Sequence, residues 1–400
     1  MLWPRGTSLL ILLVYVLTLT VPVVASGKAQ ETDNILPLEK FSPVFLGIYR
    51  KLMLIEDKIR TYSKKYNVDY DLARAVCLYE SGGNPNLTSH AGAGGYFQVM
   101  PATFRSLRVE TNIEAGIKYL SQMVRQFDRE DYALAAYNGG PGRVRRGRVP
   151  LESLQYVLNV GHYRNVLKVY EPSIRHHADQ SIRLVEISKG DDWWTISRRT
   201  GISVLQLRMH NPFLSTRALR VGQTLAYPTS PRLNLFTSVG EDLEYKTLHG
   251  DNYLHLAFIL NVDRDAMRDA NALWRLQTLP AEQILRIPLD WTGKHTEHSV
   301  EAGEDLSTVA EKLKSTPWRI IRDNYLFWNE EISEGQVLKV RAVPPKPTYL
   351  VYQVRSGDTL GALAERYGTS VRAIQATNNL GRRTLIRIGQ RLRIPTRNIG

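Results

Sequence analysis

The chain has 400 residues, a formal net charge of +13 and one cysteine. This length predicts more than one domain, and a single cysteine excludes an intramolecular disulfide. The positive charge favours polyanions or anionic surfaces as partners.

A secretory signal peptide is predicted at the start of the chain. Residues 1–25 contain one early positive charge, Arg5, and an apolar run from Leu9 to Val24 that is followed by small residues. This order is typical of a signal peptide, and Pro22 near the end of the run favours cleavage. The alternative is an uncleaved N-terminal membrane anchor formed by residues 9–24. We therefore expect an exported protein of the periplasm or cell envelope.

A helical domain is predicted over residues 49–170. It follows a polar lead-in over 26–48 that includes an extended segment with Pro37 and Pro43. From Tyr49 onward, apolar residues recur at three- and four-residue steps, which places them on one face of a helix. The pattern predicts helices over 49–66, 72–80, 112–127, 132–137 and 152–170.

Glu80 occupies an unusual position at the end of one of these helices. The apolar face before it includes Leu72, Val76 and Tyr79, and the run SGGNP ends the helix because Gly and Pro do not sustain it. A carboxylate at the negative end of the helix dipole, among apolar and aromatic neighbours, has a raised pKa. A general acid needs such a pKa to protonate a glycosidic oxygen near neutral pH. The alternative for Glu80 alone is a helix-end residue in solvent.

The stretch after Glu80 has a specific order of small and polar residues. It contains Glu80, Ser81, Asn84, Pro85, Ser89, Ala91, Gly92, Ala93, Gly95, Gln98, Met100 and Pro101. Two further motifs follow, Asn112 to Leu120 with Gly116, and AAYNGG at 135–140. Together these motifs resemble the catalytic domain of the lytic transglycosylases, which is related in fold to goose-type lysozyme. The resemblance covers residues 50 to 170 and implies an all-helical, lysozyme-like fold.

The resemblance also implies which side chains surround the acid. We predict Glu80 as the catalytic residue and five substrate-binding residues: Ser89, Gln98, Met100, Tyr137 and Asn138. Gln98 can donate and accept hydrogen bonds, which suits the N-acetyl group of an amino sugar. Ser89 can bind substrate or orient Glu80, and Tyr137 can hold the Glu80 carboxyl or stack on a sugar. The alternatives are a core position for Met100 and a helix-capping role for Asn138.

The reaction depends on whether Glu80 has a partner. Most glycosidases use two carboxyl groups, but five other acids of the helical domain match no catalytic position of the family: Glu110, Glu114, Asp128, Glu130 and Asp131. The resemblance implies that Glu80 protonates the oxygen between N-acetylmuramic acid and N-acetylglucosamine. It then takes the proton of the muramic C6 hydroxyl, which closes a 1,6-anhydro ring without water. We expect no cofactor, and no cluster has metal-ligand spacing.

An internal repeat fills the second half of the chain, after a predicted linker over 171–182. A Gly followed by an acid, and then an Asn 21 residues after that Gly, occur four times. The pairs are Gly190 and Asn211, Gly250 and Asn271, Gly303 and Asn324, and Gly357 and Asn378. Each copy predicts a small βααβ unit, over 183–229, 244–290, 297–343 and 350–396.

The last copy resembles the LysM module, which binds glycans containing N-acetylglucosamine. The resemblance implies a groove bordered by Gly357, Asp358, Thr359, Asn378, Asn379 and Leu380. The copies at 244–290 and 297–343 are degenerate, since Ala281-Glu282 replaces the expected Gly in one and Glu304 the expected Asp in the other. The alternative for the array is a spacer without affinity.

The sequence therefore predicts a multidomain α and α+β protein, in which an all-helical lysozyme-like domain precedes four small βααβ LysM-type modules. The expected function is that of a peptidoglycan lytic transglycosylase, exo or endo, held on wall glycan strands by LysM modules and without a nucleic-acid partner. Two alternatives stay open. One is a non-catalytic peptidoglycan-binding scaffold, and the other is a hydrolytic muramidase, which needs a second carboxylate near Glu80.

Overall fold

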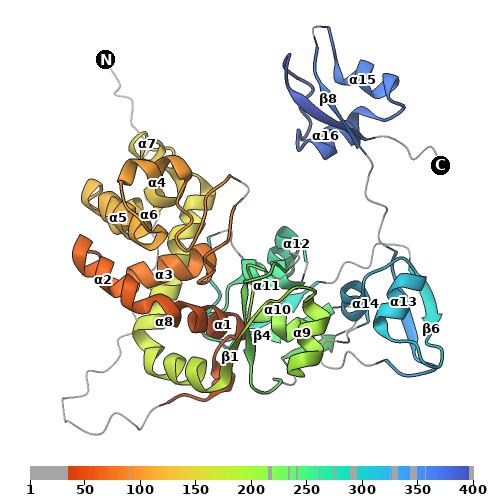
Figure 1. The fold of residues 1–400 in the computed structure, drawn as a ribbon, viewed down its shortest axis with the longest axis horizontal. Coiled ribbons are helices and arrows are strands. Elements are labelled where there is room, and N and C mark those ends of the chain that lie inside the picture. Colours follow the sequence, from red (N-terminus) through yellow and green to blue (C-terminus); the bar gives the residue numbers. More distant parts are fainter. Residues whose placement is uncertain are drawn as a thin grey trace, which may run out of the picture.

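The computed structural model describes residues 35–395 (Figure 1), with gaps at 90, 215–218, 233–234, 240–241, 261, 274–275, 289–294, 325, 327–331, 343–348 and 356. The predicted signal peptide lies outside the described residues. Within the described ranges, no helix is both long enough and apolar enough to cross a membrane.

A helical domain opens the described chain (Figure 1). Its elements are η1 Leu38–Lys40, α1 Pro43–Leu52, η2 Met53–Ile55, α2 Glu56–Tyr66, α3 Tyr70–Ser81, α4 Pro101–Leu107, α5 Asn112–Gln126, α6 Glu130–Gly139, α7 Pro141–Arg145 and α8 Leu151–Ser181. The helices α3 and α8 pack along each other, and their buried faces join α1, α5 and α6 in one hydrophobic core. The predicted all-helical fold is confirmed.

Local chemistry fixes both ends of α3, the helix that carries Glu80. Asp69 caps its N-terminus by accepting a hydrogen bond from the Leu72 N–H at 2.8 Å. Gly82 ends it in the left-handed region, with φ +56°. A Cβ at Gly82 would lie 2.7 Å from Ile48 and 2.8 Å from Phe213. Only glycine satisfies both the backbone conformation and the close packing.

The N-terminal lead-in differs from the prediction, which placed an extended segment at Pro43. Pro43 is instead the first residue of α1, where its missing N–H has no helical partner to lose and its fixed φ suits the helix. Ser42 caps this helix by accepting from the Phe45 N–H. Nine of the ten residues of α1 are buried. The stretch predicted as lead-in therefore supplies part of the core.

The predicted linker over 171–182 is also wrong. The helix α8 continues to Ser181, and strand β1 begins at the next residue. Pro172 lies inside this helix. Its lost hydrogen bond is outweighed by burial of Ile174 and Ala178 and by ion pairs of Glu171 with Arg74 at 2.5 Å and Arg175 at 3.1 Å.

Four βααβ units follow within the described ranges. Unit 1 contains β1 Ile182–Glu186, α9 Trp193–Thr200, α10 Val204–Met209 and β2 Thr224–Pro228. Unit 2 contains β4 Asp242–Lys246, α11 Tyr253–Leu260, α12 Arg264–Ala270 and β5 Ile284–Ile287, with an added strand β3 Phe236–Val239. Unit 3 contains β6 Thr296–Ser299, α13 Leu306–Lys312, α14 Pro317–Asp323 and β7 Val337–Val340. Unit 4 contains β8 Tyr349–Gln353, α15 Leu360–Arg366, α16 Val371–Thr377 and β9 Arg391–Pro395. In each unit the first and last strands pair antiparallel.

The repeated sequence marks have structural roles in every unit. The Gly of the first turn has a φ of +90°, +89°, +81° or +86°, a conformation that other residues rarely adopt. The acid after it accepts a hydrogen bond from a backbone N–H three residues earlier. The Asn side chain donates to the carbonyl four residues earlier and to the last strand fifteen residues later. These marks therefore specify the fold of the unit.

Candidate active site

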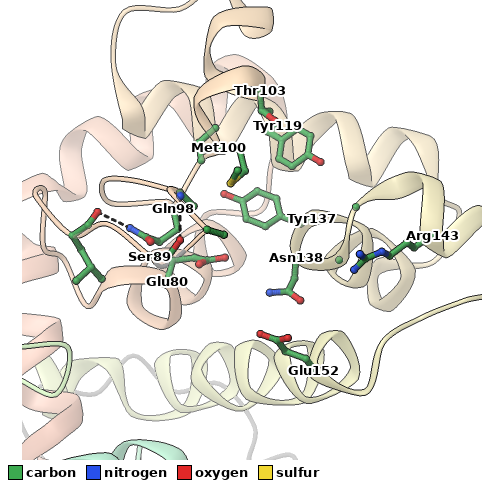
Figure 2. A pocket seen from close by; sticks show the side chains of 16 residues that line it. Glu80, Ser89, Gln98, Met100, Thr103, Tyr119, Tyr137, Asn138, Arg143 and Glu152 are labelled. Atoms are coloured by element: carbon green, nitrogen blue, oxygen red, sulfur yellow. Dashed lines mark hydrogen bonds between the residues drawn. The ribbon is translucent and has the colours of Figure 1, made fainter. Parts of the chain in front are cut away.

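A cleft of about 820 Å³ opens in the helical domain at the C-terminal end of α3 (Figure 2). Its walls come from α3, from the loop over 87–100, and from α4, α5, α6, α7 and the first turn of α8. All six residues predicted for the site line it: Glu80, Ser89, Gln98, Met100, Tyr137 and Asn138.

Glu80 is the acid at the centre of this arrangement. Burial raises the pKa of its carboxyl to about 8. The Tyr156 hydroxyl on α8 interacts with the carboxylate, which lowers the pKa and partly offsets the effect of burial. That hydroxyl is itself buried and has no hydrogen-bond partner of normal geometry among the described residues, Glu80 included, so the two groups interact without a formed hydrogen bond. At neutral pH the Glu80 carboxyl at the cleft is therefore protonated.

Gln98 is held by the loop that it belongs to. Its Nε2 donates to the carbonyl oxygens of Leu87 at 3.0 Å and Gly95 at 2.8 Å, and its φ of +45° is unusual for a side-chain-bearing residue. Figure 2 shows the side chain beside Ser89 and Glu80. Both amide hydrogens have backbone partners, so the side chain can only accept a hydrogen bond from a ligand. The sequence predicted that Gln98 both donates hydrogen bonds to a ligand and accepts them, and only the accepting role remains open to it.

Tyr137 does not hold Glu80, contrary to one of the two roles predicted for it. Its hydroxyl donates to the Phe97 carbonyl at 2.8 Å, which ties α6 to the loop before Gln98. The Ser89 Oγ accepts from the Ala93 N–H at 3.0 Å, so its hydroxyl hydrogen remains available to a ligand. Met100 is 42% exposed at the cleft, so a core position for it is wrong.

Asn138 links two walls of the cleft. Its Oδ1 accepts a hydrogen bond from the Ser153 Oγ of α8 at 2.8 Å. It lies one residue before the end of α6, whose C-cap is Gly140. Its amide nitrogen stays on the cleft side, where Figure 2 shows it between Tyr137 and Glu152.

A second tier of residues sets the position of the loop. The Asn112 side chain accepts from the Phe97 N–H at 2.9 Å and donates to the Gly94 carbonyl at 2.8 Å. Gly116 leaves room for the Phe97 ring, since a Cβ there would lie 2.2 Å from it. The second sequence motif therefore acts by holding the loop that presents Gln98.

Two residues of the site were missed by sequence reasoning, and both lie on α8. Tyr156 contacts an acid 76 positions away in the chain, a pairing that helix periodicity does not reveal. Glu152 is an exposed second carboxylate that lines the same cleft as Glu80. An acid in the first turn of a helix is ordinary, so nothing in its spacing sets Glu152 apart.

The predicted groove residues of unit 4 are largely engaged within the module. Asp358 accepts from the Arg355 N–H at 2.7 Å and the Tyr352 hydroxyl at 2.8 Å, and Thr359 caps α15. Asn378 and Asn379 line a shallow hollow of about 420 Å³ together with Arg391 and Arg393. Gly357 is exposed and Leu380 is half-buried. Their contact with glycan stays a prediction.

The fold and the site together define a lysozyme-like helical domain whose cleft holds an acid of raised pKa, followed by small βααβ modules. Comparison with family models agrees. Residues 57–149 match the transglycosylase SLT domain, and residues 185–228, 298–341 and 352–395 match the LysM domain. The chain thus contains an SLT domain and three LysM domains. The prediction of four LysM modules is corrected to three, because unit 2 keeps the βααβ order but lies outside the matched segments.

Several curated proteins are homologous to the chain. The soluble lytic murein transglycosylase of Salmonella typhimurium is 32% identical over 160 residues, which cover 33% of this chain and 25% of the relative. The membrane-bound lytic murein transglycosylase D of Escherichia coli is 22% identical over 358 residues, 79% of this chain and 71% of the relative. The chain spans about a quarter of the length of the first relative.

Solved structures give local matches. An inactive mutant of the lytic transglycosylase Slt from Pseudomonas aeruginosa is 27% identical, with a TM-score of 0.27 over 29% of this chain and 24% of that one. The soluble lytic transglycosylase SLT70 of Escherichia coli is also 27% identical, with a TM-score of 0.25 over 30% of this chain and 25% of that one.

Proposed function

We propose that this protein is a peptidoglycan lytic transglycosylase. It cleaves the β-1,4 bond between N-acetylmuramic acid and N-acetylglucosamine and leaves a 1,6-anhydro end on the muramic residue. The observation that carries this proposal is Glu80, a carboxyl whose burial raises its pKa to about 8 at the wall of a cleft. Such a group is protonated at neutral pH and can act as a general acid.

The same residue serves both halves of the reaction. Glu80 first donates its proton to the glycosidic oxygen, and the C–O bond to the muramic C1 breaks. The resulting carboxylate is stabilised by the Tyr156 hydroxyl, which interacts with the charged form. It then accepts the proton of the muramic C6 hydroxyl while that oxygen bonds to C1. Glu80 ends protonated, as it began, and no water is consumed.

The cleft supplies partners for an N-acetyl sugar. The free carbonyl oxygen of Gln98 is placed to accept from an acetamido N–H, because both amide hydrogens of Gln98 are already bonded to backbone. Ser89 offers a hydroxyl hydrogen from the same wall. Arg143 lines the opposite side and supplies a positive charge for carboxylates of the substrate.

The LysM domains would keep the enzyme on the wall. Modules that each bind glycan weakly raise the occupancy of the chain when several are joined, because the second contact is intramolecular. We place the protein outside the cytoplasm, in the periplasm or cell envelope, on the grounds of the predicted signal peptide and a substrate that lies there. The net charge of +13 is compatible with an anionic wall.

Glu152 gives one specific reason to keep a second candidate, a hydrolytic muramidase. It is a second carboxylate in the cleft, and a base that activates water would turn the same fold into a hydrolase. A scaffold without activity is the third possibility, and it requires that Glu80 has no catalytic role.

The test is the mass of the products released from purified sacculi by residues 26–400, beside the variants Glu80→Gln and Glu152→Gln. Muropeptides lighter by one water, lost with Glu80→Gln and retained with Glu152→Gln, support the transglycosylase. Reducing ends that are lost with both variants indicate a hydrolase. Sacculi that bind the protein but release nothing favour the scaffold.

A further inference from the structure

Unit 2 differs from the other three described units in the exposure of its first turn. In units 1, 3 and 4 the Gly of this turn is exposed and the acid after it is half-buried. In unit 2 both are buried, and Asn252 and Tyr253 are only 2% and 5% exposed. The turn is covered by the helical domain, since Gly250 lies against Phe45 of α1.

Asn252 makes a contact that its counterparts do not make. The equivalent residues Asp192, Asp305 and Thr359 cap the first helix of their units. Asn252 also does so, by accepting from the Leu254 N–H at 2.9 Å. In addition its Nδ2 donates to the Asn159 Oδ1 of α8 at 2.9 Å. A carboxylate at this position could cap the helix but could not donate.

His255 occupies a position that holds Thr195, Thr308 or Ala362 in the other units. Its Nδ1 forms a hydrogen bond of 3.1 Å with the Tyr163 hydroxyl of α8. Its ring stacks on Tyr79 of α3, with 6.4 Å between centroids, and meets Phe213 of unit 1 edge-on at 5.1 Å. Burial lowers the pKa of His255 to about 4, so this ring is neutral at pH 7.

Glu282 is a third departure from the repeat pattern, at the site where unit 2 lacks the expected Gly. Its φ is +69°, a strained conformation for a residue with a side chain. Its carboxylate pairs with Lys40 at 2.8 Å and also with Lys246. Nearby, the Ser42 N–H donates to the His249 carbonyl at 3.0 Å, and the His249 N–H donates to the Lys40 carbonyl at 2.9 Å. Backbone and side chains thus join unit 2 to the helical domain.

These contacts converge on the back of the catalytic acid. Tyr79 precedes Glu80 in α3, and its ring packs edge-on against Tyr156 at 5.3 Å. Phe213 lies against Gly82, the residue that ends α3. The rings of His255 and Phe213 therefore pack against the C-terminal end of α3, which carries Glu80. In Figure 1, α10 lies beside α1, and α11 lies next to α10.

We propose that unit 2 is a fixed wall of the active-site domain rather than a glycan-binding module, and that His255 and Asn252 are positioning residues for Glu80. Asn252, His255 and Glu282, which differ from their counterparts in the other units, all contact the helical domain. The turn that would border a glycan groove is buried against the helical domain and is not accessible to glycan. The positioning role rests on the function proposed above, whereas the docking does not.

The test uses the full exported chain with Asn252→Ser, which keeps the helix cap but cannot reach Asn159, and with His255→Ala. Thr308→Ala, at the position of unit 3 that corresponds to His255, is the matched control. Three properties are measured well below the unfolding temperature: hydrogen exchange of the amides over 78–83, the pH profile of kcat on sacculi, and co-sedimentation with sacculi.

We expect His255→Ala to lower kcat about tenfold and Asn252→Ser about threefold, with binding to sacculi unchanged. Exchange over 78–83 should accelerate in both variants, and the alkaline limb of the kcat profile should move to lower pH because water reaches the back of Glu80. The other titratable groups around Glu80 are unaltered in these variants: Cys77, Tyr79, Tyr137, Glu152 and Tyr156. Thr308→Ala should change none of these properties.

Unchanged exchange over 78–83 in both variants would overturn the proposal, and so would a fall in kcat with the alkaline limb in place. A wild-type chain that releases no product would refute the proposed enzyme, yet the exchange data would still decide whether unit 2 supports α3. Added N-acetylglucosamine oligomers should leave exchange over 250–256 unaltered, and protection of those amides would show that unit 2 binds glycan.

Discussion

Replacing Glu80 by Gln should abolish activity and, at the same time, stabilise the protein at neutral pH. The folded pKa of Glu80 is about 8, against 4.5 for an ordinary glutamate carboxyl. A carboxyl with a raised pKa binds more protons folded than unfolded, so its contribution to stability falls as pH rises from 4.5 through 8. At pH 7, which lies about 2.5 pH units above the unfolded pKa and below the folded one, this corresponds to about 3 kcal/mol of lost stability, because each unit is worth about 1.4 kcal/mol.

Glu80→Gln removes this penalty, since an amide does not ionise. Its free energy of unfolding should exceed that of the wild type by about 3 kcal/mol at pH 7 and by less than about 1 kcal/mol at pH 5. Loss of the general acid should lower the rate of sacculus digestion by about 10³-fold. The measurement is urea unfolding, followed by circular dichroism at 222 nm, at both pH values.

Glu152→Gln is the matched control, because it alters an exposed carboxylate of the same cleft. Its stability should stay within about 0.5 kcal/mol of the wild type at both pH values. Equal stability of Glu80→Gln and the wild type at pH 7 would mean that Glu80 is ionised in the folded state. The reasoning that makes it a general acid would then fail.

Three further changes have expected outcomes. Tyr156→Phe should lower kcat about tenfold. It should also move the alkaline limb of the pH profile to higher pH, because the hydroxyl lowers the pKa of Glu80. A move of that limb to lower pH would contradict this. Arg74 and Arg175 hold the pKa of Glu171 down at about 2, so Glu171→Gln should cost about 2 kcal/mol at pH 7, after allowance for partial exposure. Urea titrations should show that cost fading as pH falls from 4.5 to 2, and an equal cost at pH 3 would exclude the ion pairs as its source. Burial lowers the pKa of Lys51 to about 7, so wild-type stability should rise between pH 7 and 10 and that rise should be absent in Lys51→Met.

The six residues predicted for the site line one cleft because most of them lie close together along the chain. Glu80, Ser89, Gln98 and Met100 fall within about twenty positions, and a helix followed by a Gly-rich loop brings them to one wall. Tyr137 and Asn138 come from the motif AAYNGG, which ends a helix. Tyr156 and Glu152 were missed because helix packing alone places α8 across the cleft.

The errors in the fold prediction share a physical cause, which is that tertiary packing overrode local signals. Pro43 and Pro172 both favour extended or linking segments when only their neighbours in the sequence are known. One begins a helix, where proline is well tolerated. The other lies inside a helix that ion pairs and buried side chains hold together. No window of sequence contains both Glu171 and Arg74, so this compensation is invisible before the chain is folded.

The degenerate second repeat shows why loss of a motif is informative. The Gly, the acid and the Asn that specify the βααβ fold are all retained in unit 2, as Gly250, Asp251 and Asn271. The positions that changed, Asn252, His255 and Glu282, all bond or pack against the helical domain or against unit 1. A repeat that drifted without a role would not keep its folding marks while three of its altered positions contact the helical domain. An active site that holds an unpaired carboxyl at a cost of about 3 kcal/mol needs such a neighbour, because a loosened helix end would hydrate Glu80 and let its pKa fall back toward 4.5.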